Sequence, residues 1–466
     1  MRTPTANGDT RLSLWQRVRE FAVPPSMIEA ATARRSTGDW AGACAAAAVD
    51  VDLDLRSLAR THGRDVAARV RGDLRHLAPD LLRWHLPRIA PDGLLRPGLT
   101  LTLARYGADG RDGAAPLHLV VRTAPAWADA GQRIGLALWE APPGGARSHR
   151  HPRPGPDRRY RLDLHRHLWD ARRAGELRPR SGADRAPADG SPPGTPDLPL
   201  MLPHRHRCAV DRWAAEAAIL LHAEGRSAGT VTVRLGSRRR LLLDVRTDGD
   251  GLAPPVLRVA AAAEHGAAAA LPVLPDAATR VPPDLDLLRA GLIDAGRLHP
   301  LVAPALAPGD PPAAVARPPG PAGQPRFVEC RGARHRIGLV DGALAPLDHD
   351  PAEIRREELL AALTGTPLPC LQAVDEAHRR PDCLPGVRER LDHGDTAGAL
   401  AVVEGLLGPD ALLRSGDLRD ELEAAALRRI TYGLFRAGLS GPAPGRFPTG
   451  PRRPRENRSH PRHAFH

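Results

Sequence analysis

Apolar side chains recur at helical spacing through the first part of the chain. Leu14, Val18 and Phe21 are three or four residues apart, so one face of a helix would carry all three. Pro24 follows directly and cannot continue such a helix. Similar spacing continues further along, and it predicts a helical region over residues 10–90.

Alternation of apolar and polar residues then replaces the helical pattern. Residues 99–106, 117–123 and 133–139 alternate, and the turn-forming stretch YGADGRDG separates the first two runs. Alternation places every second side chain on one face of a strand. These runs predict a β-meander over residues 97–140.

The same order of patterns returns later in the chain. A helical run at 209–224 precedes strand-like runs at 230–235, 240–247 and 256–262. We therefore predict a second unit that combines a helix with a sheet, over residues 204–300.

The last folded part is predicted over residues 326–439. Residues 327–331 and 336–340 have the pattern of a β-hairpin. Asp350 is placed to cap a helix whose first residue is Pro351. The apolar spacing stays helical from there to residue 439.

Three stretches have the composition of linkers or tails. Residues 141–203 are rich in Arg, Pro and Gly and predict a flexible basic linker, with a short amphipathic helix near 163–176. Residues 301–325 predict a Pro-rich linker, and residues 440–466 predict a disordered basic tail. The expected fold class is α+β, with helical regions at both ends around antiparallel sheet cores.

Two pairs of segments resemble each other. GDWAGA at 38–43 returns as GDTAGA at 394–399, and the strands at 99–123 resemble those at 230–247. The pieces around each Gly-Asp pair resemble the helical hairpins of tetratricopeptide-type repeats, but the tandem period of about 34 residues is missing, so they assign no family. The resemblance implies packed helix pairs, which often serve as docking surfaces. The similar segments indicate either a duplicated unit or a coincidence of common residue types.

The composition excludes several enzyme classes. The chain has 466 residues and no lysine, so all 66 of its Lys and Arg residues are arginine. A Walker A loop, a protein kinase and a Schiff-base enzyme each need a lysine at the reacting group. Aromatic residues make up only 3% of the chain, which argues against functions that depend on base stacking.

The net charge of +12 is unevenly distributed. Residues 142–180 carry a net charge of +7 and residues 440–466 carry +5, so these two segments account for the whole excess. Arginine can bind a phosphate through two parallel hydrogen bonds, and flexible arginine-rich arms could hold nucleic acid without sequence preference.

The densest group of acidic and imidazole side chains lies near the C-terminal helices. Asp348, His349, Asp350, His378 and His393 are the candidates for a metal site or an acid–base pair. The alternative is structural, because Asp350 is placed as a helix cap. The stretch also lacks a His-Glu-x-x-His spacing.

The cysteines give a weaker indication of a metal. Five are scattered along the chain without a Cys-x-x-Cys pair, as expected for reduced thiols in a cytoplasmic protein. His204, His206 and Cys208 alternate, so an extended segment would place all three on one face. Zinc needs a fourth group, which the neighbouring sequence does not supply.

These features predict a non-catalytic interaction or scaffold protein that docks a protein partner, and no cofactor is expected. The first alternative is a metal-dependent or acid–base enzyme that uses the cluster at 348–395. The second alternative is non-specific nucleic-acid association through the arginine-rich segments. No stretch of about 18 apolar residues occurs, so a membrane-spanning segment is not expected.

Overall fold

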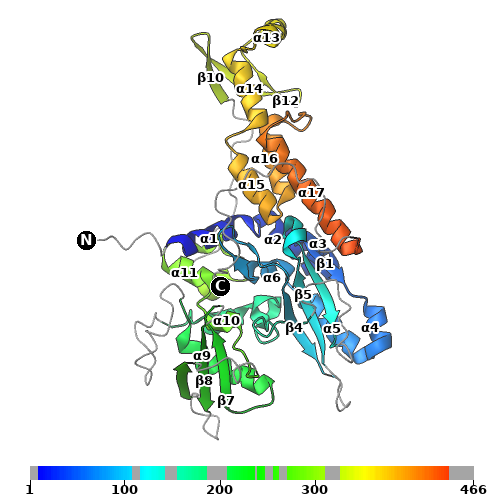
Figure 1. The fold of residues 1–466 in the computed structure, drawn as a ribbon, viewed down its shortest axis with the longest axis vertical. Coiled ribbons are helices and arrows are strands. Elements are labelled where there is room, and N and C mark those ends of the chain that lie inside the picture. Colours follow the sequence, from blue (N-terminus) through cyan, green and yellow to red (C-terminus); the bar gives the residue numbers. More distant parts are fainter. Residues whose placement is uncertain are drawn as a thin grey trace, which may run out of the picture. The chain divides into compact units, whose positions relative to one another are not determined.

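The computed structural model describes residues 9–107, 116–141, 155–185, 207–236, 239–246, 256–261, 270–309 and 326–439. They form an α+β fold with antiparallel sheets and helical regions at both ends, as predicted (Figure 1). The chain divides into two compact units. The first contains the described residues up to 309 except 128–132, and the second contains residues 326–439 together with 128–132.

Six helices occupy most of the first eighty-five residues. They are α1 (Asp9–Phe21), α2 (Pro25–Ser36), α3 (Trp40–Ala46), α4 (Leu55–His62), α5 (Arg64–His76) and α6 (Pro79–His85). The predicted helical region also contains a strand, β1 (Val49–Asp52), in which Val49 is buried and Asp52 is exposed. The alternation of valine and aspartate over these four residues favours a strand over a helix.

The first sheet has the order β1-β6-β5-β4. Its other strands are β4 (Thr100–Tyr106), β5 (Leu117–Thr123) and β6 (Ile134–Trp139). These three form the predicted antiparallel meander, whereas β1 pairs with β6 in parallel. Smaller elements adjoin these strands in the chain: β2 (Arg88–Ile89), β3 (Leu94–Leu95) and the short 3-10 helices η1 (Ala126–Ala128) and η2 (Ala130–Gln132). Leu74 and Trp84 from the helices share one core with Leu101 and Leu119 of the sheet.

Residues 155–185 differ from the predicted flexible linker. Tyr160, Leu162, Trp169 and Leu177 are buried in the main core. The helix predicted near 163–176 is formed instead by three short elements. They are the 3-10 helices η4 (Arg166–Leu168) and η5 (Ala171–Glu176), followed by α7 (Leu177–Ser181). Arg, Pro and Gly are so abundant in residues 155–185 that the composition does not reveal the apolar residues that pack into the core.

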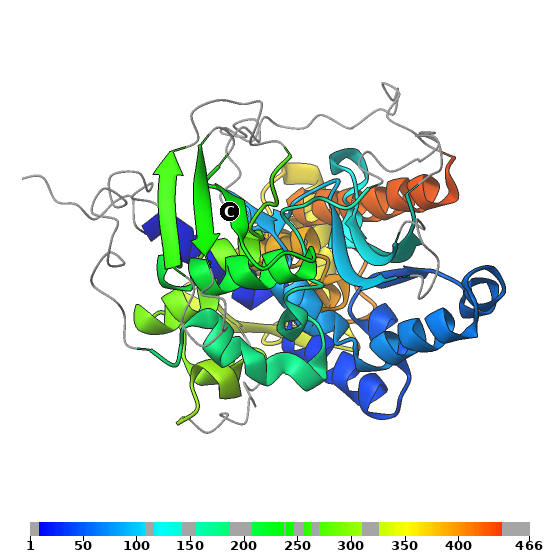
Figure 2. The ribbon, with the colours of Figure 1, turned by 90° about the horizontal axis from the view of Figure 1, so that it is seen from below.

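The second meander is built as predicted. Its elements are α9 (Val210–Ala223), β7 (Gly229–Arg234), β8 (Arg240–Arg246) and β9 (Val256–Ala261), and the strands pair in the order β7-β8-β9. α9 lies against the strands in green in Figure 2, where Trp213 and Leu220 share a core with Val231 and Leu243. Four short helices follow: α10 (Asp276–Thr279), α11 (Pro283–Arg289), η7 (Ala295–Arg297) and α12 (Ala303–Leu306).

The two meanders share a detail of topology. In each, a threonine of the first strand forms a parallel bridge with a segment that returns after the third strand: Thr102 with Arg161, and Thr232 with Val273. Each threonine donates its backbone N–H to the returning segment and accepts another N–H from it, at 2.8–3.1 Å. The segments that resemble each other in sequence therefore also share their local architecture.

The second unit combines a three-stranded sheet with five helices. Its elements are β10 (Arg326–Cys330), β11 (Ala333–Val340), β12 (Ala343–Pro346), α13 (Pro351–Thr364), α14 (Pro369–Arg379), α15 (Leu384–His393), α16 (Thr396–Leu407) and α17 (Asp417–Ala437). α15, α16 and α17 lie side by side in Figure 1. Leu391, Leu407 and Leu418 are buried in the core that these helices share.

The remaining sequence predictions fall on residues that the structure does not describe. These are most of the predicted linkers, at 142–154, 186–206 and 310–325, and the predicted tail at 440–466. Within the described residues, no helix combines the length and the apolar character that crossing a bilayer requires.

Candidate functional site: an arginine-lined pocket

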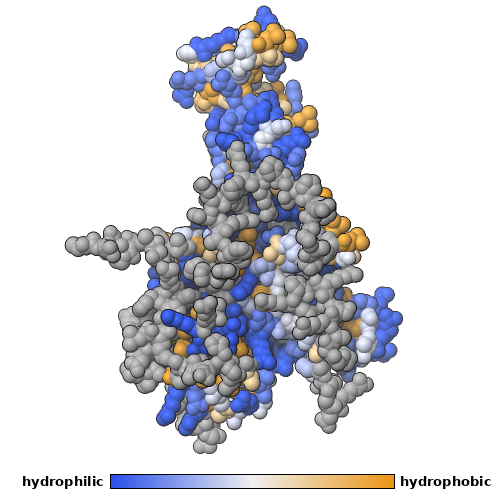
Figure 3. Space-filling view, viewed as in Figure 1, coloured by the Kyte–Doolittle hydropathy of each residue, from blue (hydrophilic) through white to orange (hydrophobic). Residues whose placement is uncertain are grey.

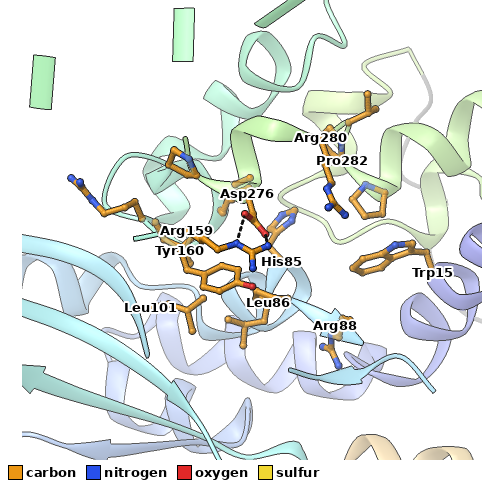
Figure 4. Close-up of a pocket in the computed structure, with 18 of the residues that line it drawn as sticks. Trp15, His85, Leu86, Arg88, Leu101, Arg159, Tyr160, Asp276, Arg280 and Pro282 are labelled. Carbon is orange, nitrogen blue, oxygen red and sulfur yellow. Dashed lines mark hydrogen bonds and ion pairs between the residues drawn. The ribbon is translucent and has the colours of Figure 1, made fainter. Parts of the chain in front are cut away.

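A cavity of about 140 Å³ lies inside the first unit, where the two returning segments meet (Figure 4). Residues 159–162 form one wall, and residues 275–283 form the opposite wall. The N-terminal helix α1 and the end of α6 complete the lining. Five lining residues are arginines, whereas Asp276 is the one lining residue with a carboxylate.

Arg159 and Asp276 join the two walls. The guanidinium of Arg159 donates two hydrogen bonds to the carboxylate, from Nε at 3.0 Å and from Nη2 at 2.6 Å. The backbone N–H of Asp276 donates to the carbonyl oxygen of Arg159 at 2.9 Å. Both side chains are largely buried, so this doubly bonded pair fixes the distance between the walls.

Two other lining arginines are also neutralised by carboxylates. Arg11 on α1 donates to Asp286 at 2.8 Å. Arg161 bonds Asp163 at 2.8 Å and Glu224 at 2.6 Å. Their positive charges are therefore balanced within the protein, and these arginines leave little unbalanced charge for a ligand.

Arg280 is different. Only 8% of this residue is exposed, and its Nε and Nη1 atoms have no hydrogen-bond partner among the described residues. Burial lowers the pKa of Arg280 to about 10, although nearby Asp276 raises it, so the side chain is still a cation at neutral pH. In Figure 4 the side chain extends toward Trp15 and His85. A buried positive charge thus faces the cavity without a bonded anion.

Arg88 and His85 add to the same environment. Arg88 is 2% exposed and donates to two carbonyl oxygens, of Gly93 at 3.3 Å and of Arg83 at 3.0 Å. Burial lowers its pKa, and the neighbouring Arg83 and Arg19 cations lower it further. Burial also lowers the pKa of His85 to about 3, so this imidazole is neutral at physiological pH. Its Nε2 atom is buried and has no partner among the described residues.

Apolar side chains make up the rest of the lining. They are contributed by α1, the end of α6, β4, η4 and the start of α11, and include Trp15, Leu86, Leu101, Leu168 and Pro282. The cavity lining therefore combines apolar side chains with guanidinium groups, a combination typical of sites for small amphipathic ligands.

A buried network next to the cavity holds α1, α6 and α11 together. Arg19 donates to Asp284 from Nε at 2.5 Å and from Nη2 at 3.1 Å. The indole N–H of Trp84 donates to the same carboxylate at 2.9 Å, and Arg19 Nη1 donates to the carbonyl oxygen of Trp84 at 2.8 Å. The two residues that bond Asp284 are 265 and 200 positions away from it in the chain, and the network rigidifies one side of the pocket.

The predicted site residues Asp348 and Asp350 have structural partners. Asp348 accepts hydrogen bonds from the guanidinium and the backbone N–H of Arg336, and these bonds lower its pKa to about 2. Asp350 caps α13 by accepting the N–H of Ala352 at 2.8 Å. The cap was predicted from the sequence.

The three predicted histidines have different environments. His378 on α14 is buried, and burial and Arg414 lower its pKa. His393 ends α15 and is also buried, 3.8 Å from Glu389. His349 alone of the predicted set belongs to a group of converging ligand atoms, and its companions are Cys330 and Cys370. Burial and the neighbouring Cys330 raise the pKa of the Cys370 thiol to about 12.

The second predicted cluster is only partly described. His204 and His206 lie outside the described residues, and Cys208 forms an antiparallel bridge with Arg280 beside the pocket. Burial raises the pKa of the Cys208 thiol to about 11.

The arginines of the pocket were not identified as a site from the sequence. Arg159 and Arg161 belong to a segment that composition marks as a linker, yet they alternate with the buried residues Tyr160 and Leu162. That alternation is the signal of a strand with one buried face. Arg280 has no comparable local signal, because its burial depends on chain segments far away.

The basic segment also bears on nucleic-acid binding. Its arginines at 159, 161, 166, 172 and 180 all form ion pairs with carboxylates. A paired arginine is less available to a phosphate backbone. Nucleic-acid association therefore remains a proposal that rests on arginines outside the described residues.

The chain matches no protein-family model, no curated protein and no solved structure.

Proposed function

We propose that the first unit binds a small organic anion in the arginine-lined pocket. The observation that carries this proposal is Arg280, a buried cation that faces the cavity with two N–H groups unbonded within the described residues. A carboxylate or a phosphate accepts hydrogen bonds from a guanidinium and supplies the missing negative charge.

The energetics favour a ligand at this position. Moving an ion out of water costs several kcal/mol unless a partner compensates it, and an unbonded buried donor costs about 1–3 kcal/mol. Arg159, Arg161 and Arg11 have carboxylate partners that offset this cost, whereas Arg280 has none within hydrogen-bond distance in the part of the chain that the structure describes. A bound anion would offset it in the same way.

The size and lining of the cavity narrow the class of ligand. A cavity of roughly 150 Å³ holds a benzene ring, and this one measures about 140 Å³. Trp15, Leu86 and Leu101 offer apolar contact to a body of that size. The ligand class is therefore a single-ring or short-chain compound with a carboxylate or phosphate group.

The pocket favours binding over catalysis. A general base works best when its pKa is close to the operating pH. With a pKa of about 3, His85 is too weak a base for that role near neutrality. The other titratable lining groups are five guanidinium cations, the carboxylate of Asp276, which is bonded by Arg159, and Tyr160, whose pKa is raised by burial.

The proposal can be tested with four probe compounds: benzoate, phenyl phosphate, inorganic phosphate and the neutral analogue benzamide. Thermal unfolding of the full chain is measured with each probe at constant ionic strength. We expect the two aromatic anions to raise the Tm more than inorganic phosphate does, and benzamide to leave it unchanged. Equal Tm values with all four compounds contradict the proposal.

Docking of a protein partner, predicted from the sequence, is a second candidate function. The observation that favours it is α13, a helix of 14 residues of which none is buried. Leu359, Leu360 and Leu363 are exposed, the last to 85%, and Figure 3 shows apolar surface at this end of the second unit. Leucines at this spacing pack well against the same pattern on another helix.

A second copy of α13 is the occupant that these residues favour. An antiparallel pair centred near Leu360 would bring the exposed leucines of the two copies together, which is the self-complementarity that a twofold interface needs. Analytical ultracentrifugation of the full chain should show a dimer that Leu363→Glu dissociates. A wild-type chain that stays monomeric at every concentration contradicts this candidate.

A further inference from the structure

Three ligand-type side chains converge in the second unit, independently of the arginine-lined pocket. Cys330 ends β10, His349 lies between β12 and α13, and Cys370 is the second residue of α14. Their sulfur and nitrogen ligand atoms all lie within 4.8 Å of one another. Residues up to 40 positions apart in the chain thus meet at one point.

The three side chains are shielded from water and available for bonding. Cys330 and Cys370 are buried and form no disulfide. The side chain of His349 is 4% exposed, and its Nε2 atom has no hydrogen-bond partner among the described residues. Glu353 lies 3.7 Å from its other ring nitrogen, Nδ1. This contact is too long for a hydrogen bond, but it leaves a carboxylate near the second ring nitrogen, which often has an acidic partner in metal-binding histidines.

The surrounding fold lacks an apolar core of its own. In β10–β12 and α13, which are fully described, the buried residues are Cys330 and Ile337. Neither residue belongs to the helical core of this unit. So little buried apolar surface does not offset the entropy of ordering three strands and a helix. Small folds of this kind are usually held by a metal or by disulfides.

We propose that Cys330, Cys370 and His349 bind one Zn²⁺ ion. The ion would link β10, the segment between β12 and α13, and α14. Two thiolates and one imidazole are ligands that zinc prefers, and tetrahedral zinc at about 2.3 Å from sulfur sets two sulfurs about 3.8 Å apart. That spacing lies within the 4.8 Å limit of this cluster. A water molecule would be the fourth ligand of the ion.

The charges balance when the ion binds. Each thiol loses its proton to solvent, so two protons leave and the sulfur–zinc bonds form without any change of oxidation state. The two thiolates neutralise the charge of Zn²⁺, so the buried site carries no net charge. His335 stacks on His349 with ring centroids 4.3 Å apart and planes 11° apart. Its in-plane lone pairs therefore run parallel to those of His349 and do not converge on the same ion.

The metal content of the full chain tests the proposal. The protein is produced with added zinc, dialysed and analysed by mass spectrometry for metals. We expect about one zinc per chain in the wild type and in Cys383→Ser, whose cysteine lies in the same unit outside the cluster. Cys370→Ser and His349→Ala should lose most of the zinc.

A second measurement uses the wild-type chain, so it does not depend on whether the variants fold. Co²⁺ replaces Zn²⁺ in the wild-type chain, and sulfur-to-cobalt charge-transfer absorption should appear and then vanish on addition of Zn²⁺. A wild type without bound metal overturns the proposal, as does equal zinc in Cys370→Ser and Cys383→Ser. A Cys330–Cys370 disulfide in the protein purified with zinc also overturns it.

Discussion

Arg159 donates two hydrogen bonds to the carboxylate of Asp276, from Nε at 3.0 Å and from Nη2 at 2.6 Å, and so joins the two walls of the pocket. The two residues are 117 positions apart in the chain. Each residue lies in or next to a segment that follows a three-stranded meander and returns to bridge the first strand of that meander. The pair therefore has a structural task that its lining neighbour Arg280 does not share.

Removing Arg159 should destabilise the first unit. Arg159→Met leaves the carboxylate of Asp276 largely buried without its partner, and breaking such a pair typically costs about 3–5 kcal/mol. Urea unfolding followed by tryptophan fluorescence measures the loss. A double variant, Arg159→Met with Asp276→Leu, should recover part of it because both charges are gone. No loss in the single variant contradicts the assigned role.

Arg280→Met should have the opposite effect on the ligand-free protein. The substitution removes a buried cation that bonds no carboxylate of the described residues, and methionine fills a similar space with apolar atoms. We expect unchanged or increased stability in the same urea experiment, together with loss of anion binding. A destabilisation as large as that of Arg159→Met would mean that Arg280 is a structural residue.

The stability of the first unit should fall as the pH is lowered from about 6.5 toward 4. Burial lowers the pKa of His85 to about 3 and that of His165 to about 4, although Glu216 raises the latter. In the unfolded chain a histidine titrates near 6.5, so between these values the unfolded state binds more protons. Each such histidine then costs about 1.4 kcal/mol per pH unit.

The pH dependence can be assigned with two variants. Thermal unfolding is measured across this range for His165→Gln and for His222→Gln, which replaces an exposed histidine of α9. His165→Gln should reduce the slope of stability against pH, and His222→Gln should not. Identical slopes in the wild type and both variants contradict the prediction.

The caps Asp39 and Asp395 should contribute unequally to stability. Asp39 accepts the N–H of Gly42 at 2.8 Å, and Asp395 accepts that of Gly398 at 2.9 Å. Replacing a cap by alanine usually costs about 1 kcal/mol. Asp395 is more buried and also bonds Arg390 at 2.8 Å, so Asp395→Ala should cost more than Asp39→Ala. Denaturant unfolding of both variants, with Asp→Asn controls that keep the cap, measures the difference.

Local features of the fold were predictable because their causes lie within a few residues. Asp350 caps α13 as the sequence predicts, and the alternating runs become strands β4 to β8. Asp39 and Asp395 cap α3 and α16 in the same way. Gly38 and Gly394 both adopt the left-handed conformation, with φ of +80° and +89°, before their capping aspartates. The similar hexapeptides therefore form the same helix–Gly-Asp–helix connection.

The pocket and the cysteine–histidine cluster were not predictable, since both depend on contacts between distant residues. Arg280 is buried by segments whose placement composition does not reveal, and the charge excess at 142–180 suggested a solvated linker instead of a folded wall. His349 was identified as a candidate ligand, but its partners Cys330 and Cys370 are 19 and 21 positions away. No short motif connects them.

The most direct test of the account is the affinity of the full chain for phenyl phosphate, measured by isothermal titration calorimetry in the wild type, Arg280→Met and Arg246→Met. Arg246 is a matched control, since it lies in the same unit with its side chain 69% exposed. We predict saturable one-site binding to the wild type and to Arg246→Met, and at least a tenfold weaker affinity in Arg280→Met, which corresponds to about 1.4 kcal/mol. Equal affinity in all three proteins, or no binding to the wild type, contradicts the proposal that Arg280 anchors an anion.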